Sequence, residues 1–179
     1  GDYLFFTSKK ENRILLNMGG IANLTYLPKT ADSSAVFSSD TGPGNTIMDA
    51  FVQQHFAPLQ YDKDSAIARQ GTVHSGLLSA LLEHEFFALN FPKTTGPEVF
   101  NLDYLAAAQQ RSCTYDLALE DVLATLNVFS ATTIANALNN AAAKLGEFSV
   151  YASGGGIHNP LLMEHILNLC PRVSEVHNT

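Results

Sequence analysis

The sequence predicts an α/β domain in which three neighbouring strands are followed by helices and helix–strand crossovers. Short β-forming runs alternate with glycine turns near the N-terminus, helical periodicity dominates the middle, and a further strand separates two helical segments near the C-terminus. Hydrophobic residues make up 46% and charged residues 15% of the 179 residues, a balance that predicts a globular domain with a substantial core.

The first strands are marked by apolar runs and by the glycine pair between them. Residues 13–18 (RILLNM) end at this glycine pair and residues 22–27 (ANLTYL) follow at once, so we expect a hairpin. Residues 35–38 (AVFS) are expected to form the third strand. Residues 40–45 (DTGPGN) contain two glycines and a proline, and we expect a tight loop there with no regular element.

In the middle of the chain, the apolar residues are spaced as on one face of a helix, which predicts helices there. We expect a helix over 47–55 with Asn45 as its N-cap, and a second helix over 73–87. A shorter helix is predicted over 103–111, capped by Asp103.

The longest helix is predicted over 119–145, where Gly146 provides its C-cap. The second half of this helix is rich in alanine and poor in charge, which predicts burial against a sheet. Residues 148–152 (FSVYA) predict a strand and the SGGG that follows predicts a turn. A final helix over 161–169 is opened by the Asn-Pro pair before it, with Asn as N-cap and Pro at the first position.

A last strand over 172–177 completes the predicted order of elements. Three meandering strands followed by helix–strand crossovers are typical of a ribonuclease H-like domain, with helices on both faces of the sheet. Actin-like ATPases are built from two such domains. We therefore expect residues 1–179 to form a single domain of this kind.

Composition excludes several classes of function. The net charge of −7 argues against a nucleic-acid partner, although backbone N–H groups can still hold the phosphates of a nucleotide. No run approaches the roughly 18 apolar residues that span a bilayer, and no signal peptide is visible, so we expect no membrane partner and a cytoplasmic location. The two cysteines and six histidines lack the spacing of a metal site, so we expect none built from side chains alone.

The glycine pair of the hairpin is one candidate ligand site. Gly19 and Gly20 lie between Asn17 and Asn23, at a tip where the lack of Cβ atoms lets backbone N–H groups approach an anion. A tight hairpin that binds nothing explains the same pair.

The run of three glycines after the last predicted core strand is a second candidate. Ordering three glycines costs much conformational entropy, which is explained if a flat ligand must lie against the backbone beside a helix N-terminus. A flexible connection between strand and helix is the alternative. The residues concerned are Gly154, Gly155, Gly156, His158 and Asn159.

The DTGPGN segment adds a carboxylate to these turns. Asp40 is suited to hold water around Mg²⁺, to bond a sugar hydroxyl, or to cap the turn, and the segment by itself leaves all three roles open. The loop Lys93–Gly96 (KTTG) has the ending of a phosphate-binding P-loop but lacks its leading glycine.

Taken in order, five segments resemble the 1,6-anhydro-N-acetylmuramic acid kinase family, in the sugar kinase, Hsp70 and actin superfamily. The segments are NMGGIANLTYLP, SSDTGPGNTIMDAF, FPKTTGPEVFN, EDVLATLNVFSATTIA and YASGGGIHNPLLM, and together they extend over nearly the whole chain. The resemblance implies an enzyme that uses ATP and Mg²⁺ to open the 1,6-anhydro ring of anhydro-N-acetylmuramic acid with water. The same enzyme phosphorylates O6 to give N-acetylmuramate 6-phosphate for cell-wall recycling.

The resemblance also implies roles for the turns. The hairpin from Asn17 to Asn23 would bind phosphate, and the triple-glycine turn would bind adenosine. The cleft near phosphates and sugar would be lined by Asp40, Thr41, Gly42, Gly44 and Asn45, with Lys93 and Thr94 close by. Partners implied are ATP and the sugar, with a homodimer as one form of assembly.

Three parts of the family pattern are absent from these residues. The first phosphate loop, a DGTSxDGxD-like motif, belongs to an N-terminal domain, and the catalytic aspartate is expected upstream of the YLFF segment, so no catalytic residue is assigned here. The family's final helical segment is also expected beyond Thr179. The chain therefore resembles a C-terminal ATP-binding domain that is inactive alone, because phosphoryl transfer needs both walls of the cleft.

Two other interpretations remain open at the level of sequence. A non-catalytic module of the same superfamily could sense nucleotide or muropeptide. An exopolyphosphatase-like hydrolase is disfavoured, since the DTGPGN and PKTTG pair resembles the anhydrosugar family.

Overall fold

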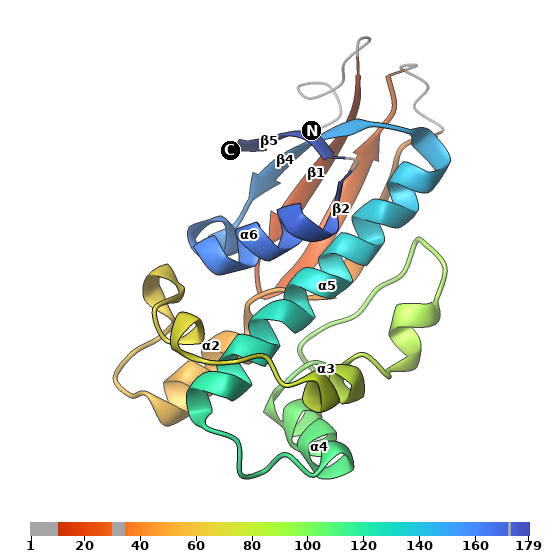
Figure 1. Cartoon of the computed structure of the whole chain (residues 1–179). Coiled ribbons are helices and arrows are strands. Elements are labelled where there is room, and N and C mark those ends of the chain that lie inside the picture. The colour runs from red at the N-terminus through yellow and green to blue at the C-terminus, as the bar shows by residue number, and fades with distance from the viewer. Residues whose placement is uncertain (1–10, 30–34, 172) are drawn as a thin grey trace.

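A five-stranded mixed sheet in the order β3-β2-β1-β4-β5 forms the framework of the computed structural model, which describes residues 11–29, 35–171 and 173–179 (Figure 1). The antiparallel meander consists of β1 (Asn12–Met18), β2 (Ile21–Leu27) and β3 (Phe37–Pro43). β4 (Phe148–Ser153) lies parallel to β1, and β5 (Val173–Asn178) lies parallel to β4. The predicted meander and the helix–strand crossovers are confirmed; Arg172 of the predicted last strand lies outside the described residues.

Five α-helices and four short 3₁₀ turns accompany the sheet in the described part of the chain. The α-helices are α2 (Thr46–His55), α3 (Ser75–Leu81), α4 (Leu102–Ser112), α5 (Leu119–Leu145) and α6 (Pro160–Leu169). The 3₁₀ turns are η2 (Lys63–Ser65), η3 (Ala68–Gln70), η4 (Glu85–Ala88) and η5 (Gly155–His158). None of the described helices is long and apolar enough to cross a membrane.

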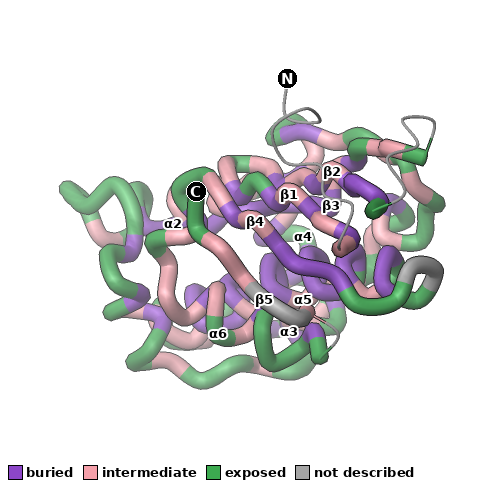
Figure 2. Tube along the Cα trace, turned by 90° about the horizontal axis from the view of Figure 1, so that it is seen from above, coloured by how far each residue is buried: buried purple, intermediate pink, exposed green. Residues whose placement is uncertain are grey.

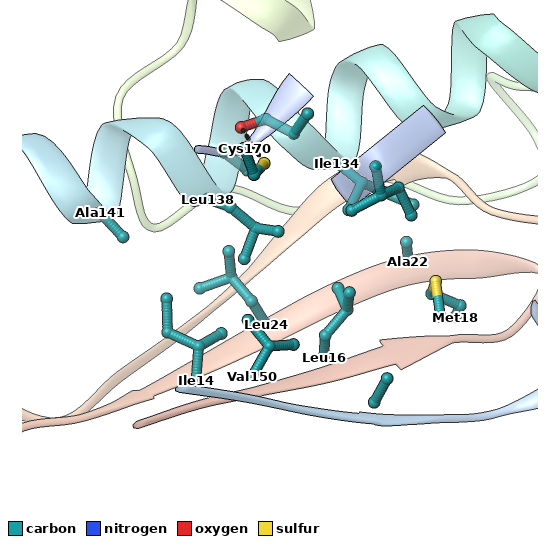
Figure 3. Close-up of a cluster of buried hydrophobic side chains, with 14 of the residues drawn as sticks. Ile14, Leu16, Met18, Ala22, Leu24, Ile134, Leu138, Ala141, Val150 and Cys170 are labelled. Atoms are coloured by element: carbon teal, nitrogen blue, oxygen red, sulfur yellow. Dashed lines mark hydrogen bonds between the residues drawn. The ribbon is translucent and has the colours of Figure 1, made fainter. Parts of the chain in front are cut away.

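The 27-residue helix α5 joins two hydrophobic clusters and so determines how the domain packs (Figure 1). Its second half lies on the sheet, where Ile134 and Leu138 pack with the β-strand residues Leu16 and Leu24 (Figure 3). Its first half, which includes Phe129, packs with α2, α3 and α4 in a separate helical layer. Most of α5 is therefore buried, either against the sheet or within the helical layer, as its low charge predicts.

The two helices that pack on the sheet, α5 and α6, lie on the same face of it (Figure 2). Alternate residues of β1 point into this core, among them Ile14 and Leu16, whereas Arg13, Leu15 and Asn17 point to the other face and are not fully buried. The predicted α/β fold is thus confirmed, but the expected helices on both faces are found on only one face of this part of the chain.

Three local predictions are wrong, the first because of a tertiary contact and the other two because of local side-chain caps. Residues 40–43 are not a loop but the end of β3, paired with β2 across a bulge at Ala22 and Asn23. The predicted helix over 73–87 is divided into α3 and η4, because His84 caps a new turn by accepting from the N–H of Phe86. α4 is capped by Asn101, whose side chain accepts from Tyr104 N, and Asp103 lies within its first turn.

Candidate functional site

The three glycine-rich turns meet at one end of the sheet. The N–H groups of Gly44 and Asn45 donate to the carbonyls of Gly20 and Gly19, each at 2.9 Å, and Thr46 N donates to Gly20 O at 3.1 Å. The start of α2 is thereby held against the tip of the β1–β2 hairpin. Its first N–H groups are already used in this contact.

The turn that follows β4 is pressed against the same hairpin. Gly154 has φ +85°, and a Cβ there would lie 2.6 Å from Asn17 Oδ1 and 2.8 Å from the carbonyl carbon of Met18. A Cβ on Gly156 would lie 2.5 Å from the Cβ of Met18. Glycine is therefore required at both positions by close packing, in addition to the backbone conformation of Gly154.

Asn45 was expected to cap α2, but its side chain connects the turns by a different hydrogen bond. Its side chain makes no cap bond to α2; Nδ2 instead donates to Met18 O at 3.1 Å. Ser130 of α5 donates to Gly44 O at 2.8 Å and anchors the turn from the helical side. The three turns thus form one rigid unit.

A row of polar side chains crosses four strands on the open face of the sheet. The register places Asn17 beside Ser153 on one side and Asn23 on the other, and Asn23 beside Asp40. Residues paired in register share a face, so all four side chains lie opposite the helical layer. Asn17 and Asn23 also line a hollow of about 170 Å³. The arrangement offers neutral oxygen donors and one carboxylate.

Asp40 already has a structural task. One of its carboxylate oxygens, Oδ2, accepts from Thr95 N at 2.9 Å, and its own N–H donates to Lys93 O at 2.9 Å. Lys93 N in turn donates to Ser39 Oγ at 2.9 Å. The KTTG loop is therefore bound along the outer edge of β3, and the carboxylate of Asp40 holds this distant loop instead of capping the DTGPGN turn.

The ammonium of Lys93 is directed toward the helical layer. Nζ donates to Phe86 O at 2.9 Å and lies 4.4 Å from the centre of the Phe86 ring. Burial lowers the pKa of this amine below its usual value. The structure brings the backbone of Lys93 to Asp40 but does not aim its charge at the glycine turns, and Thr94 is exposed beside it.

A pocket of about 370 Å³ opens beside the triple-glycine turn. Its walls come from α2, from the segment before η2 and from the turn after β4: Asn45, Met48, Asp49, Gln53, Gln60, Tyr61, Asp62, Gly155, His158 and Asn159. No Lys or Arg lies among these residues. The pocket is thus suited to the uncharged end of a ligand such as a nucleoside, and poorly suited to phosphate.

Asp49 gives this pocket an unusual titratable group. Burial raises the pKa of its carboxyl from 3.8 to about 6. Desolvation disfavours the charged form, so the ionised Asp49 side chain lowers the stability of the folded chain. A hydrogen-bond donor on a ligand would reduce this free-energy penalty.

This cost predicts a pH-dependent effect of Asp49→Asn. The raised pKa means that the wild type is penalised above about pH 6 and that the penalty fades as the pH falls toward 3.8. The full shift corresponds to about 3 kcal/mol, which partial exposure reduces to about 1–2 kcal/mol. We expect Asp49→Asn to be more stable than wild type by this amount at pH 8, with the difference lost at pH 4, in urea unfolding. Exposed Asp116→Asn is the control; a pH-independent difference would contradict the assignment.

The sequence predictions missed the α2 wall of this pocket. Met48, Asp49, Gln53 and Tyr61 were not among the expected site residues. A signal was present, because Asn45, Asp49 and Gln53 recur every four residues and so share one stripe of a helix.

The strand order, an antiparallel meander followed by two parallel strands, is that of the ribonuclease H-like fold found in actin-like ATPases. A solved structure with the same fold is the activator of the 2-hydroxyisocaproyl-CoA dehydratase from Clostridium difficile with bound ADPNP. The superposition covers 95% of this chain and 55% of the activator chain, with a TM-score of 0.58 and 11% sequence identity. The family model for anhydro-N-acetylmuramic acid kinase matches residues 2–179, and the chain belongs to this family.

Relatives within the family are much more similar in sequence. The anhydro-N-acetylmuramic acid kinases of Pseudoalteromonas atlantica and Pseudoalteromonas translucida are 77% and 60% identical over 179 residues. That of Neisseria meningitidis serogroup B is 41% identical over 97% of this chain. The chain spans about half the length of these relatives, 45% of each.

Proposed function

We propose that this chain is the nucleotide-binding, C-terminal half of a two-domain anhydro-N-acetylmuramic acid kinase. The enzyme would use ATP and water to open the 1,6-anhydro sugar and phosphorylate it to N-acetylmuramate 6-phosphate in the cytoplasm, where ATP is available. The observation that carries the proposal is the meeting of the three glycine turns between a pocket without Lys or Arg and a row of polar side chains.

In this arrangement the nucleoside would occupy the 370 Å³ pocket, against Gly155 and beside His158 and Asn159. The phosphates would extend toward the hairpin tip at Gly19 and Gly20, of which Gly20 is exposed. Glycine leaves the backbone accessible at both places. The nucleotide would thus be bound mainly by backbone and by neutral side chains, in agreement with the acidic net charge of the chain.

The donor set near the hairpin fits hydrated Mg²⁺. No group of three His, Cys, Asp or Glu side chains that could hold a metal is found in the described part of the chain. Mg²⁺ commonly retains several waters and takes one or two carboxylates together with substrate phosphates. Asn17, Asn23 and Asp40 would hold such waters, and the ion would neutralise charge on the transferred phosphoryl group. Asp40 keeps one carboxylate oxygen for this, because Oδ2 is bonded to Thr95 N.

The base that activates the attacking water is proposed to lie in the other half of the enzyme. Within these 179 residues the side chains near the turns bind and orient, and we assign none of them to proton transfer. Positioning by both walls of a cleft accounts for most of the catalysis in phosphoryl transfer.

We therefore expect the isolated chain to bind MgATP without turning it over. Calorimetry with ATP should show one site per chain, and a coupled ADP assay with anhydro-N-acetylmuramic acid should show turnover only by the full-length enzyme. ADP release by residues 1–179 alone would overturn the assignment of the catalytic base. Absence of ATP binding by both the chain and the full-length enzyme would overturn the proposed function itself.

One observation supports a second candidate, a nucleotide-sensing module without catalysis. The pocket beside the triple-glycine turn has walls from three separate segments of this chain, namely α2, the residues before η2 and the turn after β4. The reading frame upstream of Gly1 separates the two candidates, since a DGTSxDGxD-like motif there supports the kinase. Sedimentation of the full-length enzyme tests the expected homodimer.

A further inference from the structure

We propose that Ser65 and Asn127, which no motif singles out, are positioning residues for the Asn159 amide. They would fix this amide so that its N–H₂ group faces the nucleoside pocket and donates to an acceptor atom of the nucleoside. The inference rests on the proposed function and assigns a means of nucleoside selection to the same pocket.

The oxygen of the Asn159 side chain is fully engaged. It accepts from Ser65 Oγ at 2.5 Å, from Asn127 Nδ2 at 3.1 Å and from Leu162 N at 3.0 Å. Leu162 N belongs to the backbone and can only donate, so it fixes which edge of the amide is the oxygen. A flipped amide would place its N–H₂ group against this donor. Asn159 also lines the pocket, and we infer that the nitrogen is the atom left to face it.

Ser65 and Asn127 each adopt an energetically unfavourable arrangement in order to make these bonds. Ser65 is fully buried with φ +58°, in the left-handed region that disfavours side chains. Its hydroxyl is used twice, since it also accepts from Leu161 N at 3.1 Å. Asn127 is 1% exposed, and among the described residues its Oδ1 has no hydrogen-bond partner. A buried acceptor left unpaired is unfavourable, so the orientation of Asn127 serves its bond to Asn159.

The ligand chemistry follows from this orientation. A fixed N–H₂ group requires an acceptor, which a nucleoside offers at the ring nitrogens of adenine or at a ribose oxygen. No Lys or Arg is among the residues that line the pocket, so neither competes with the Asn159 N–H₂ group for this acceptor.

The test compares ATP with analogues that each lack one acceptor: 1-deaza-, 3-deaza-, 7-deaza-, 2′-deoxy- and 3′-deoxy-ATP. In the full-length wild-type enzyme, one analogue is expected to bind about 3–10-fold more weakly than ATP, the range for one neutral hydrogen bond. A deaza analogue would assign the acceptor to the base, and a deoxy analogue would assign it to the ribose.

Asn159→Asp is the decisive variant, because it keeps the shape and the three accepted bonds but removes the donor. The added negative charge affects the binding of ATP and of the analogue alike, so the ratio of the analogue Kd to the ATP Kd should fall to about 1. Ser65→Gly removes the hydroxyl and also relieves the positive φ, and Asn127→Ala removes the second donor to the Asn159 oxygen. Both variants should reduce the ratio of analogue Kd to ATP Kd and raise the KM for ATP. The kcat and the KM for the sugar should be retained. Buried Thr125→Ala, on the same helix but bonded to His74 N, is the control with an unchanged ratio.

A ratio that survives in Asn159→Asp would overturn the inference, as would a wild-type enzyme that binds ATP and all five analogues equally. Loss of stability without a change of ratio in Ser65→Gly and Asn127→Ala would show a merely structural role. A wild-type enzyme that fails to bind ATP would instead overturn the proposed function.

Discussion

Replacing Gly154 with alanine is expected to abolish measurable nucleotide binding and to destabilise the domain by about 2–5 kcal/mol. Two effects add at this position. Its φ of +85° costs a side chain about 1–2 kcal/mol. The new Cβ would also lie 2.8 Å from the Met18 carbonyl carbon, and such overpacking costs about 1–3 kcal/mol. The Asn17 side chain, whose Oδ1 would lie 2.6 Å away, can turn aside, but the Met18 carbonyl is backbone, so relief requires moving the turn away from the hairpin.

Gly146→Ala separates the two effects. Gly146 has a similar φ of +81°, but a Cβ there meets nothing within 4 Å. We expect it to show the conformational cost alone and to leave nucleotide affinity unchanged. Urea unfolding of both variants, with calorimetric titration of ATP, measures the two quantities. Equal destabilisation of the two variants would show that the close contact with β1 does not form.

Phe129→Ala is expected to cost about 3–5 kcal/mol, the usual range for removing a fully buried phenyl ring. Phe129 is 0% exposed in the first half of α5. Its ring lies 5.8 Å from that of Phe87 and 6.1 Å from that of Tyr104, between centres, so it joins α5 to η4 and α4. Helix α2, which forms one wall of the nucleoside pocket, packs in the same cluster. Weaker nucleotide binding should therefore accompany the loss of stability.

Leu167→Ala is the matched control for this substitution. Leu167 is 46% exposed on α6, and its truncation should change the free energy of unfolding by no more than about 0.5 kcal/mol. Urea unfolding followed by circular dichroism compares the two variants. A cost below about 1 kcal/mol for Phe129→Ala would mean that the helical layer does not depend on α5 as the packing indicates.

Elements encoded by neighbouring residues were predictable. The glycine pair between two β-forming runs led to the β1–β2 hairpin, and the Asn159–Pro160 pair led to the start of α6, where Asn159 caps the helix as expected. The periodicity of α5 led to its whole length, up to Gly146 at the C-cap. In each case the interactions lie within a few residues along the chain, so the local pattern contains the information.

Elements decided by distant contacts were not predictable. The strand character of Asp40–Pro43 depends on pairing with β2, and the composition of that segment is typical of a loop. The direction of the Lys93 ammonium depends on the carbonyl of Phe86. The first is a pairing between two strands and the second is a bond between the KTTG loop and η4, and neither follows from the residue types of the segment itself.

The same division applies to the candidate site. The sequence by itself determined the family, the order of the glycine turns and the negative net charge, because each is a property of residue types and spacing. Only the tertiary structure decided that the turns meet, that α2 supplies the opposite wall of the pocket, and that Asp40 already holds the KTTG loop. Those features are contacts between segments far apart in the chain, and they arise when α5 holds the helical layer against the sheet.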